Sequence, residues 1–123
     1  MRVAVLLVAL TACVAEAPER WSYVHASIVV QHCTTSACHS TLSEAGNIDL
    51  SDAATAYRSL TGRTCDDTTT PLGGYVDTAD PRASYLSVLL RREGPTGMPP
   101  NGRLSSTELE LVEDWMRAGA RCD

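Results

Sequence analysis

The chain has 123 residues, which allows one domain and leaves no room for a second. Ten arginines, no lysine and fifteen acidic residues give a formal net charge of −5, which argues against a nucleic-acid-binding protein, since that class needs a basic stripe. Hydrophobic residues make up 44 % of the chain, too many for a disordered protein. Few aromatic residues, none of them Phe, and five cysteines predict a thin core that is stabilised by disulfides or by a bound cofactor.

The beginning of the chain has the composition of an export signal. Arg2 supplies a positive start, and residues 3–10 form an apolar run that suits a signal peptide and is far too short to cross a membrane. The run ends in Leu-Thr-Ala-Cys at positions 10–13, which resembles a bacterial lipobox, where the cysteine is lipidated and becomes the new N-terminus. Cleavage of a simple secretion signal after Ala17 is the alternative, but Pro18 would then follow the cut.

These signals divide the chain into three parts. We expect residues 1–12 to be a lipoprotein signal peptide, residues 13–20 a tether lipidated at Cys13, and residues 21–123 a single folded domain. The lipid alone would hold the protein at a membrane, so the prediction is an exported lipoprotein of the cell envelope, facing the periplasm or held at the outer membrane. Thiols in that compartment are oxidised unless something else occupies them.

The first half of the domain contains two predicted helices. Apolar residues recur at helical spacing from Trp21 and predict a first helix over residues 22–32. Asp52 can cap a second helix over residues 53–60, which Gly62 ends.

Two more helices are predicted in the second half, after a loop over residues 61–79. Asp80-Pro81 is a strong helix start, and this third helix should end near Gly94-Pro95. The segment from Ser105 to Glu108 is a capping box for the fourth helix, which carries an apolar stripe. The pattern shows no convincing strand and therefore predicts an all-α fold of about four short helices with long loops.

The segment from Cys33 to His39 carries the strongest chemical signal. Two cysteines followed at once by a histidine are typical of the attachment site of c-type haem, whose vinyl groups form thioethers with the thiols while the histidine binds the iron. Four residues separate Cys33 from Cys38 instead of the usual two, and in a continuous helix these cysteines would lie about 140° apart. Thr34 and Thr35 are poor helix formers and favour a local loop at this point.

Two other interpretations of this segment remain open. A plain disulfide between Cys33 and Cys38 would close a small loop, and the oxidising compartment would favour it. A zinc site is the third interpretation, with His25 or His32 as a further ligand, although no second cluster of cysteine and histidine occurs at the usual spacing.

Met98 is the second candidate ligand. A single methionine usually fills a gap in a core. This one lies in the sequence Gly-Pro-Thr-Gly-Met-Pro-Pro, where proline and glycine fix the backbone and keep Met98 out of any helix. A thioether held in a loop about sixty residues after a haem-binding histidine suits a second axial ligand of the iron, with His32 as the fallback.

The order of these motifs resembles the planctomycete-type cytochrome c domain over residues 22–120. The quoted matches are the cysteine pair with His39, then Asp80-Pro81-x-x-Ser84-Tyr85-Leu86, Gly97-Met98-Pro99-Pro100, Leu104-Ser105, Glu108-Leu109, and Trp115-Met116-x-x-Gly119-Ala120. The most specific parts are Met-Pro-Pro and the final Trp-hydrophobic-x-x-Gly-Ala. The departure from the family pattern is the wider spacing of the cysteines.

The resemblance implies a small cytochrome c-like fold and one-electron transfer rather than catalysis of its own. It implies one covalent haem c attached to Cys33 and Cys38, with His39 as the proximal and Met98 as the distal ligand of the iron. It also implies that Trp115 packs the last helix against the first, near the haem. The alternative is a haemless lipoprotein of the same fold, stapled by two disulfides, which acts as an interaction module in the cell envelope.

Cys65 and Cys122 remain to be assigned. Cys65 lies in the long loop and Cys122 follows the last helix, so we expect one disulfide that ties the loop to the C-terminus.

An acidic run opens the last helix and consists of Glu108, Glu110, Glu113 and Asp114. The favoured interpretation is a solvated face that complements the helix dipole. The functional alternative is a docking surface, which predicts a redox partner protein with a basic docking face.

Overall fold

The computed structural model describes residues 18–123. The predicted signal peptide, the lipidation site Cys13 and most of the tether lie outside the described residues. The described part is helical and contains no strand, which confirms the all-α prediction. Within it, no helix has the length and apolar character that crossing a membrane requires.

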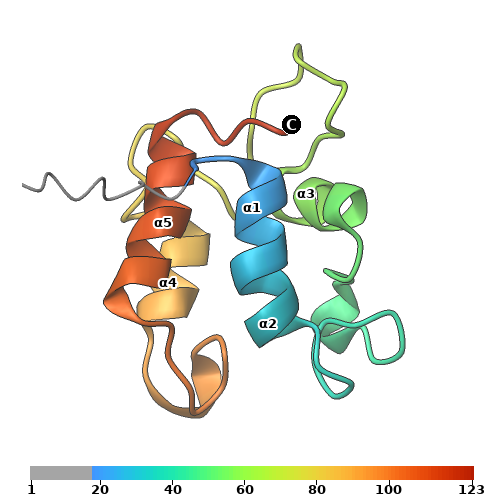
Figure 1. The fold of residues 1–123 in the computed structure, drawn as a ribbon, viewed down its shortest axis with the longest axis vertical. Coiled ribbons are helices and arrows are strands. Elements are labelled where there is room, and N and C mark those ends of the chain that lie inside the picture. Colours follow the sequence, from blue (N-terminus) through green and yellow to red (C-terminus); the bar gives the residue numbers. More distant parts are fainter. Residues whose placement is uncertain (1–17) are drawn as a thin grey trace, which may run out of the picture.

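The first helix is continuous and consists of three labelled segments, α1 (Trp21–Val24), the π-helical turn η1 (His25–Val29) and α2 (Val30–Cys33). It therefore agrees with the predicted helix over residues 22–32 to within one residue at each end. Its buried face carries Trp21, Val24 and Ile28, the residues whose spacing predicted it. The helix runs through the middle of the molecule, between α5 on one side and α3 on the other (Figure 1).

The other helices surround this central one. They are α3 (Ala53–Thr61), α4 (Tyr85–Arg91) and α5 (Ser106–Arg117), with short 3-10 turns η2 (Ala45–Asn47) and η3 (Gly94–Thr96) in the loops. Asp52 caps α3 as predicted, since its carboxylate accepts a hydrogen bond from the Thr55 backbone N–H at 2.9 Å.

The third predicted helix starts later than the sequence indicated. Asp80-Pro81 begins only a turn, in which the Asp80 carbonyl accepts hydrogen bonds from the N–H groups of Ala83 and Ser84. Ser84 is extended and caps α4, which begins at Tyr85 and ends at Arg91, short of the predicted end near Gly94. Two capping signals follow each other here, and the second one sets the helix start.

Three aromatic side chains form the centre of the core. The rings of Trp21 and Trp115 lie 5.0 Å apart between centroids, and Tyr57 lies 5.7 Å from Trp21. Their polar atoms are satisfied: the Trp21 indole N–H donates to the Ala53 carbonyl at 2.7 Å, and the Tyr57 hydroxyl donates to the Ala120 carbonyl at 2.9 Å. Few large rings therefore suffice, because all three pack against one another where α1, α3 and α5 meet.

The expected disulfide between Cys65 and Cys122 is present in the structure. It joins the long loop after α3 to the segment that follows α5. The same C-terminal segment is held from the other side, because Asp123 accepts hydrogen bonds from the backbone N–H and the hydroxyl of Ser22 at 2.8 and 2.6 Å. Both ends of the described chain are therefore fastened close together.

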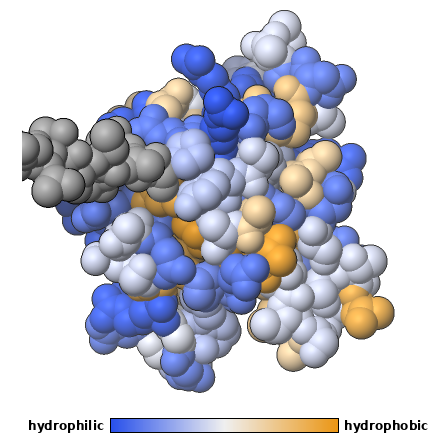
Figure 2. Space-filling view, viewed as in Figure 1, coloured by the Kyte–Doolittle hydropathy of each residue, from blue (hydrophilic) through white to orange (hydrophobic). Residues whose placement is uncertain are grey.

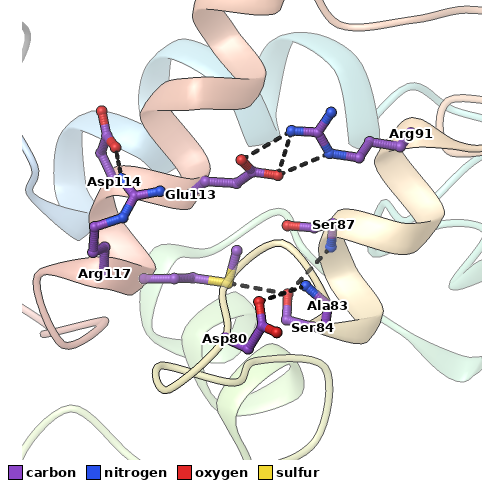
Figure 3. Close-up of polar contacts among 9 residues, drawn as sticks. Asp80, Ala83, Ser84, Ser87, Arg91, Glu113, Asp114 and Arg117 are labelled. Carbon is purple, nitrogen blue, oxygen red and sulfur yellow. Dashed lines mark hydrogen bonds and ion pairs between the residues drawn. The ribbon is translucent and has the colours of Figure 1, made fainter.

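The acidic run does not form one solvated face, so that prediction is wrong for Glu113. This carboxylate is buried against α4, where it accepts hydrogen bonds from the Arg91 guanidinium at 2.8 to 3.0 Å (Figure 3). Asp114 pairs with Arg117 one turn further along α5. The Glu113 position faces a neighbouring helix, which the charge pattern alone did not reveal.

The capping box of α5 is complete. The Ser105 hydroxyl accepts a hydrogen bond from the Glu108 N–H, and the Glu108 carboxylate accepts in return from the Ser105 N–H and hydroxyl, both at 2.8 Å. The same carboxylate contacts His32 Nε2 at 2.8 Å. Hydrogen bonds from Ser105, and secondly the contact with His32, lower the pKa of Glu108 to about 2.

Replacing Glu108 with glutamine is therefore expected to destabilise the protein at neutral pH by about 1 kcal/mol, an amount reduced by the partial exposure of the site. Because folding lowers the pKa of Glu108, the stabilisation by its carboxylate is complete above about pH 4.5 and is lost as the pH falls toward about 2. Urea unfolding of both forms across this range measures the difference. A gap in stability that stays constant down to the acid end would contradict the assignment to the ionised carboxylate.

Candidate cofactor site

A cavity of about 340 Å³ lies at the end of the molecule where α2 stops. Its walls come from α2 and the loop that follows it, from the end of α3 and the loop after it, and from α4 and the loop before α5, and they are largely apolar. Figure 2 shows the surface notched at the lower end of the molecule, between the two loop regions. The volume falls in the range of about 300–1,000 Å³ that is typical of small-molecule and cofactor sites.

All four residues that the sequence predicted as haem-binding line this one cavity. They are Cys33, Cys38, His39 and Met98. Met98 lies about sixty residues along the chain from the other three. The fold therefore brings all four residues to one cavity, although they are far apart in the sequence. An apolar cavity that gathers two thiols, an imidazole and a thioether has the donor set that c-type haem requires.

The wide cysteine spacing is accommodated by a loop. The helix ends at Cys33, and a turn follows in which the Cys38 N–H donates to the Thr35 carbonyl at 2.9 Å. The His39 N–H then donates back to the Cys33 carbonyl, also at 2.9 Å. This bulge brings both cysteines to the same cavity, whereas a continuous helix would have pointed them apart.

The two thiols are not joined to each other in the structure. Burial, and secondly the nearby Cys38, raise the pKa of the Cys33 thiol to about 11. A thiol with such a pKa stays protonated at neutral pH, and its reactivity toward disulfide exchange is low. The Cys38 sulfur accepts a hydrogen bond from the Thr35 hydroxyl at 3.0 Å.

A hydrogen bond to the loop that follows His39 orients its imidazole ring. Its Nδ1 donates a hydrogen bond to the Ala45 carbonyl at 2.8 Å. Ala45 is held in turn by its own N–H, which donates to the Cys38 carbonyl at 3.1 Å. With the proton on Nδ1, the lone pair of Nε2 is available for a metal ion, which is the second-sphere arrangement typical of histidine ligands.

Met98 reaches the cavity because the loop before it lies tightly against the end of α4. The Met98 N–H donates to the Leu89 carbonyl at 3.0 Å. A Cβ atom on Gly97 would collide with the Arg92 carbonyl oxygen, so only glycine allows this approach. The glycine and proline residues around Met98 therefore place the thioether, as the sequence pattern indicated.

Three further residues that the sequence singled out each lie in a different environment. His25, which the sequence suggested as a zinc ligand, is buried, and its Nε2 donates to the Leu50 carbonyl at 2.9 Å. His32 lines the cavity but contacts Glu108. Trp115 packs α5 against α1 as expected and is not among the residues that line the cavity.

The residues that the structure describes offer no zinc site. Among them, no three histidine, cysteine, aspartate or glutamate side chains come together as a metal-binding group. The zinc interpretation therefore gains no support from the geometry.

Sequence reasoning missed the aromatic wall of the cavity. Tyr75 and Tyr85 both line it, and their rings stack at 5.4 Å between centroids with 23° between their planes. Tyr85 belongs to one of the motifs that carry the resemblance to the cytochrome c domain, but Tyr75 lies in a loop that carried no signal. The Leu86 N–H also donates a hydrogen bond to the Tyr75 carbonyl at 2.8 Å, a contact between distant segments that no sequence pattern predicts.

Fold and site together define a small all-α protein with an apolar cavity that presents two thiols, an imidazole and a thioether. No protein-family model, no curated protein and no solved structure matches the chain. The assignment of a function therefore depends on the arrangement of the chain's own residues.

Proposed function

We propose that this protein is a single-haem c-type cytochrome that transfers one electron at a time. The observation that carries the proposal is the meeting of Cys33, Cys38, His39 and Met98 in one apolar cavity. Cys33 and Cys38 would hold haem through thioethers, each formed when an S–H adds across a vinyl group, so that no oxidant is needed. His39 and Met98 would supply the two axial ligands of the iron.

The surrounding residues prepare these ligands. The hydrogen bond to Ala45 fixes the His39 tautomer and strengthens it as a donor. Met98 opposite a histidine would favour the reduced state of the iron more than a second histidine does. The apolar walls would surround much of a bound haem with a low-polarity environment, which also raises the potential.

The bound haem would supply a ferric–ferrous couple, and the protein would supply ligands, burial and a surface for partners. Because protein side chains take both axial positions in this proposal, we assign electron transfer and no enzymatic activity. The disulfide between Cys65 and Cys122 supports an oxidising compartment, in line with export through the predicted signal. Lipidation at Cys13 is part of the proposal and would anchor the domain in the cell envelope.

Purification from a host with working cytochrome c maturation tests the proposal. We expect a c-type pyridine haemochrome band and an intact mass increased by one haem. The double variant C33S/C38S should lose the covalent haem, because no thiol remains to add to the vinyl groups. The control C65S/C122S removes the same number of thiols elsewhere and should keep it.

The opposite result identifies the competing hypothesis. A protein without haem, whose mass shows both pairs of cysteines oxidised, would be a disulfide-stapled lipoprotein of the same fold. The electron-transfer function would then be excluded for the mature protein, and a role as an interaction module in the envelope would replace it.

A further inference from the structure

One face of α4 is apolar and open to solvent. Tyr85 is 52 % exposed and Val88 is 39 % exposed. At 100° per residue, these two positions lie on the same side of the helix as Leu89 and Arg92. Exposed apolar side chains also occur elsewhere in the described chain, as at Leu42, so the exposure of Tyr85 and Val88 gains meaning only from what surrounds them.

Arginines lie in the chain just before and just after α4, although the protein as a whole is acidic. Arg82 precedes α4 and Arg92 follows it, and both are exposed. Among the described residues neither arginine takes part in an ion pair, and Glu93 beside Arg92 is already paired with Arg103 at 2.6 Å. One arginine outside the ion pairs therefore lies near each end of the apolar α4 face, with the exposed Asp80 two residues before Arg82.

The acidic run on α5 offers much less free charge. Glu108 contacts His32, Glu113 is buried against Arg91, and Asp114 pairs with Arg117. Only Glu110 of this run is exposed and outside the ion pairs of the described residues. Charge complementarity thus favours a partner for the α4 face over one for the acidic run.

The α4 face is also the outer side of a cavity wall. Tyr85 and Leu89 line the cavity while they remain partly exposed, and the Tyr75 ring supports Tyr85 by stacking on it. A protein that rested on α4 would be separated from the cavity by a single layer of side chains. Electron transfer between proteins needs a short distance between their redox groups. Rigid tyrosines also contact a partner at low entropic cost.

We propose that the exposed face of α4 at Tyr85 and Val88, with Arg82 and Arg92 beside its two ends, is the docking surface for the electron-transfer partner, and that this partner presents carboxylates around an apolar patch. The inference depends on the proposed function, because the partner is an electron donor or acceptor. Carboxylates would meet the two arginines and steer the encounter, while Tyr85 and Val88 would cover the apolar patch.

Tris(oxalato)cobaltate(III), a compact anion that presents carboxylate groups, is the kinetic probe. It accepts one electron from the reduced haem-loaded protein, so that Co(III) becomes Co(II) and the iron is oxidised. At low ionic strength we expect R82E/R92E to slow this oxidation by about tenfold, and high salt should remove the effect. The control R58E/R121E changes the net charge equally, at exposed arginines outside this face, and should slow it far less.

Equal slowing of both double variants would mean that only net charge matters and would overturn the proposal. A second measurement does not depend on haem. The paramagnetic, redox-inert tris(oxalato)chromate(III) should broaden the amide signals of residues 82–92 before those near Arg58 or Arg121. Absence of haem with this broadening would refute the proposed function alone, whereas broadening elsewhere would refute the docking surface.

Discussion

Replacing Met98 with alanine is expected to lower the reduction potential of the haem-loaded protein and to change its visible spectrum. The shift should be a sizeable fraction of the roughly 0.8 V range over which axial ligands set haem potentials. The physical reason is that a thioether stabilises the reduced iron, and no other sulfur ligand lies near in the loop. Spectroelectrochemical titration measures the potential and the spectrum in one experiment.

Met116→Leu is the matched control, because it removes a buried methionine outside the cavity wall. Its volume changes little, so the potential should stay near that of the unchanged protein. An unchanged spectrum and potential in M98A would exclude Met98 as a ligand. If H32A then altered both, His32, which also lines the cavity, would be the distal ligand instead.

Replacing Arg91 with methionine should cost about 3 kcal/mol of unfolding free energy. Glu113 is 3 % exposed and accepts all of its ion-pair hydrogen bonds from Arg91 (Figure 3). Removal of the arginine leaves a buried carboxylate without its partner, and such a group is strongly destabilising. Because α4 and α5 meet at this pair, urea unfolding followed by helical circular dichroism measures the loss.

The double variant R91M/E113M separates the charge from the packing. It replaces the ion pair with two flexible apolar side chains, so most of the lost stability should return. Arg117→Met, which breaks the exposed pair with Asp114, should cost less than about 1 kcal/mol. If R91M were no more costly than R117M, the pair between α4 and α5 would be of minor importance to the fold.

Local signals in the sequence predicted the helices well. The spacing of Trp21, Val24 and Ile28 and the capping box at Ser105 both depend on residues within a few positions, and both were confirmed. The predicted start of α4 was wrong because Asp80 and Ser84 each carry a side chain that can cap a helix. The sequence alone does not say which of the two turns that follow them continues as a helix. Tyr85, which stacks on Tyr75, is the first residue of the turn that does continue as a helix.

The four residues that meet in the cavity were easier to single out in the sequence than their surroundings. Cysteine, histidine and methionine are chemically distinctive, so a few residues carry the signal. The burial of Glu113 and the stacking of Tyr75 depend on which segments become neighbours in the fold. The identity of these two residues does not reveal their neighbours. The bulge that lets Cys33 and Cys38 share a cavity was only suggested by the poor helix formers between them.

The unbroken helix from Trp21 to Cys33 sets a distance as well as a fold. With a rise of 1.5 Å per residue, its two ends are roughly 18 Å apart. At the Trp21 end, Ser22 is bonded to Asp123, so both ends of the described chain leave the domain at one pole, while the cavity lies at the other (Figure 1). In the proposed lipoprotein, the helix would therefore hold the cavity away from the membrane, on the side from which a partner protein would approach.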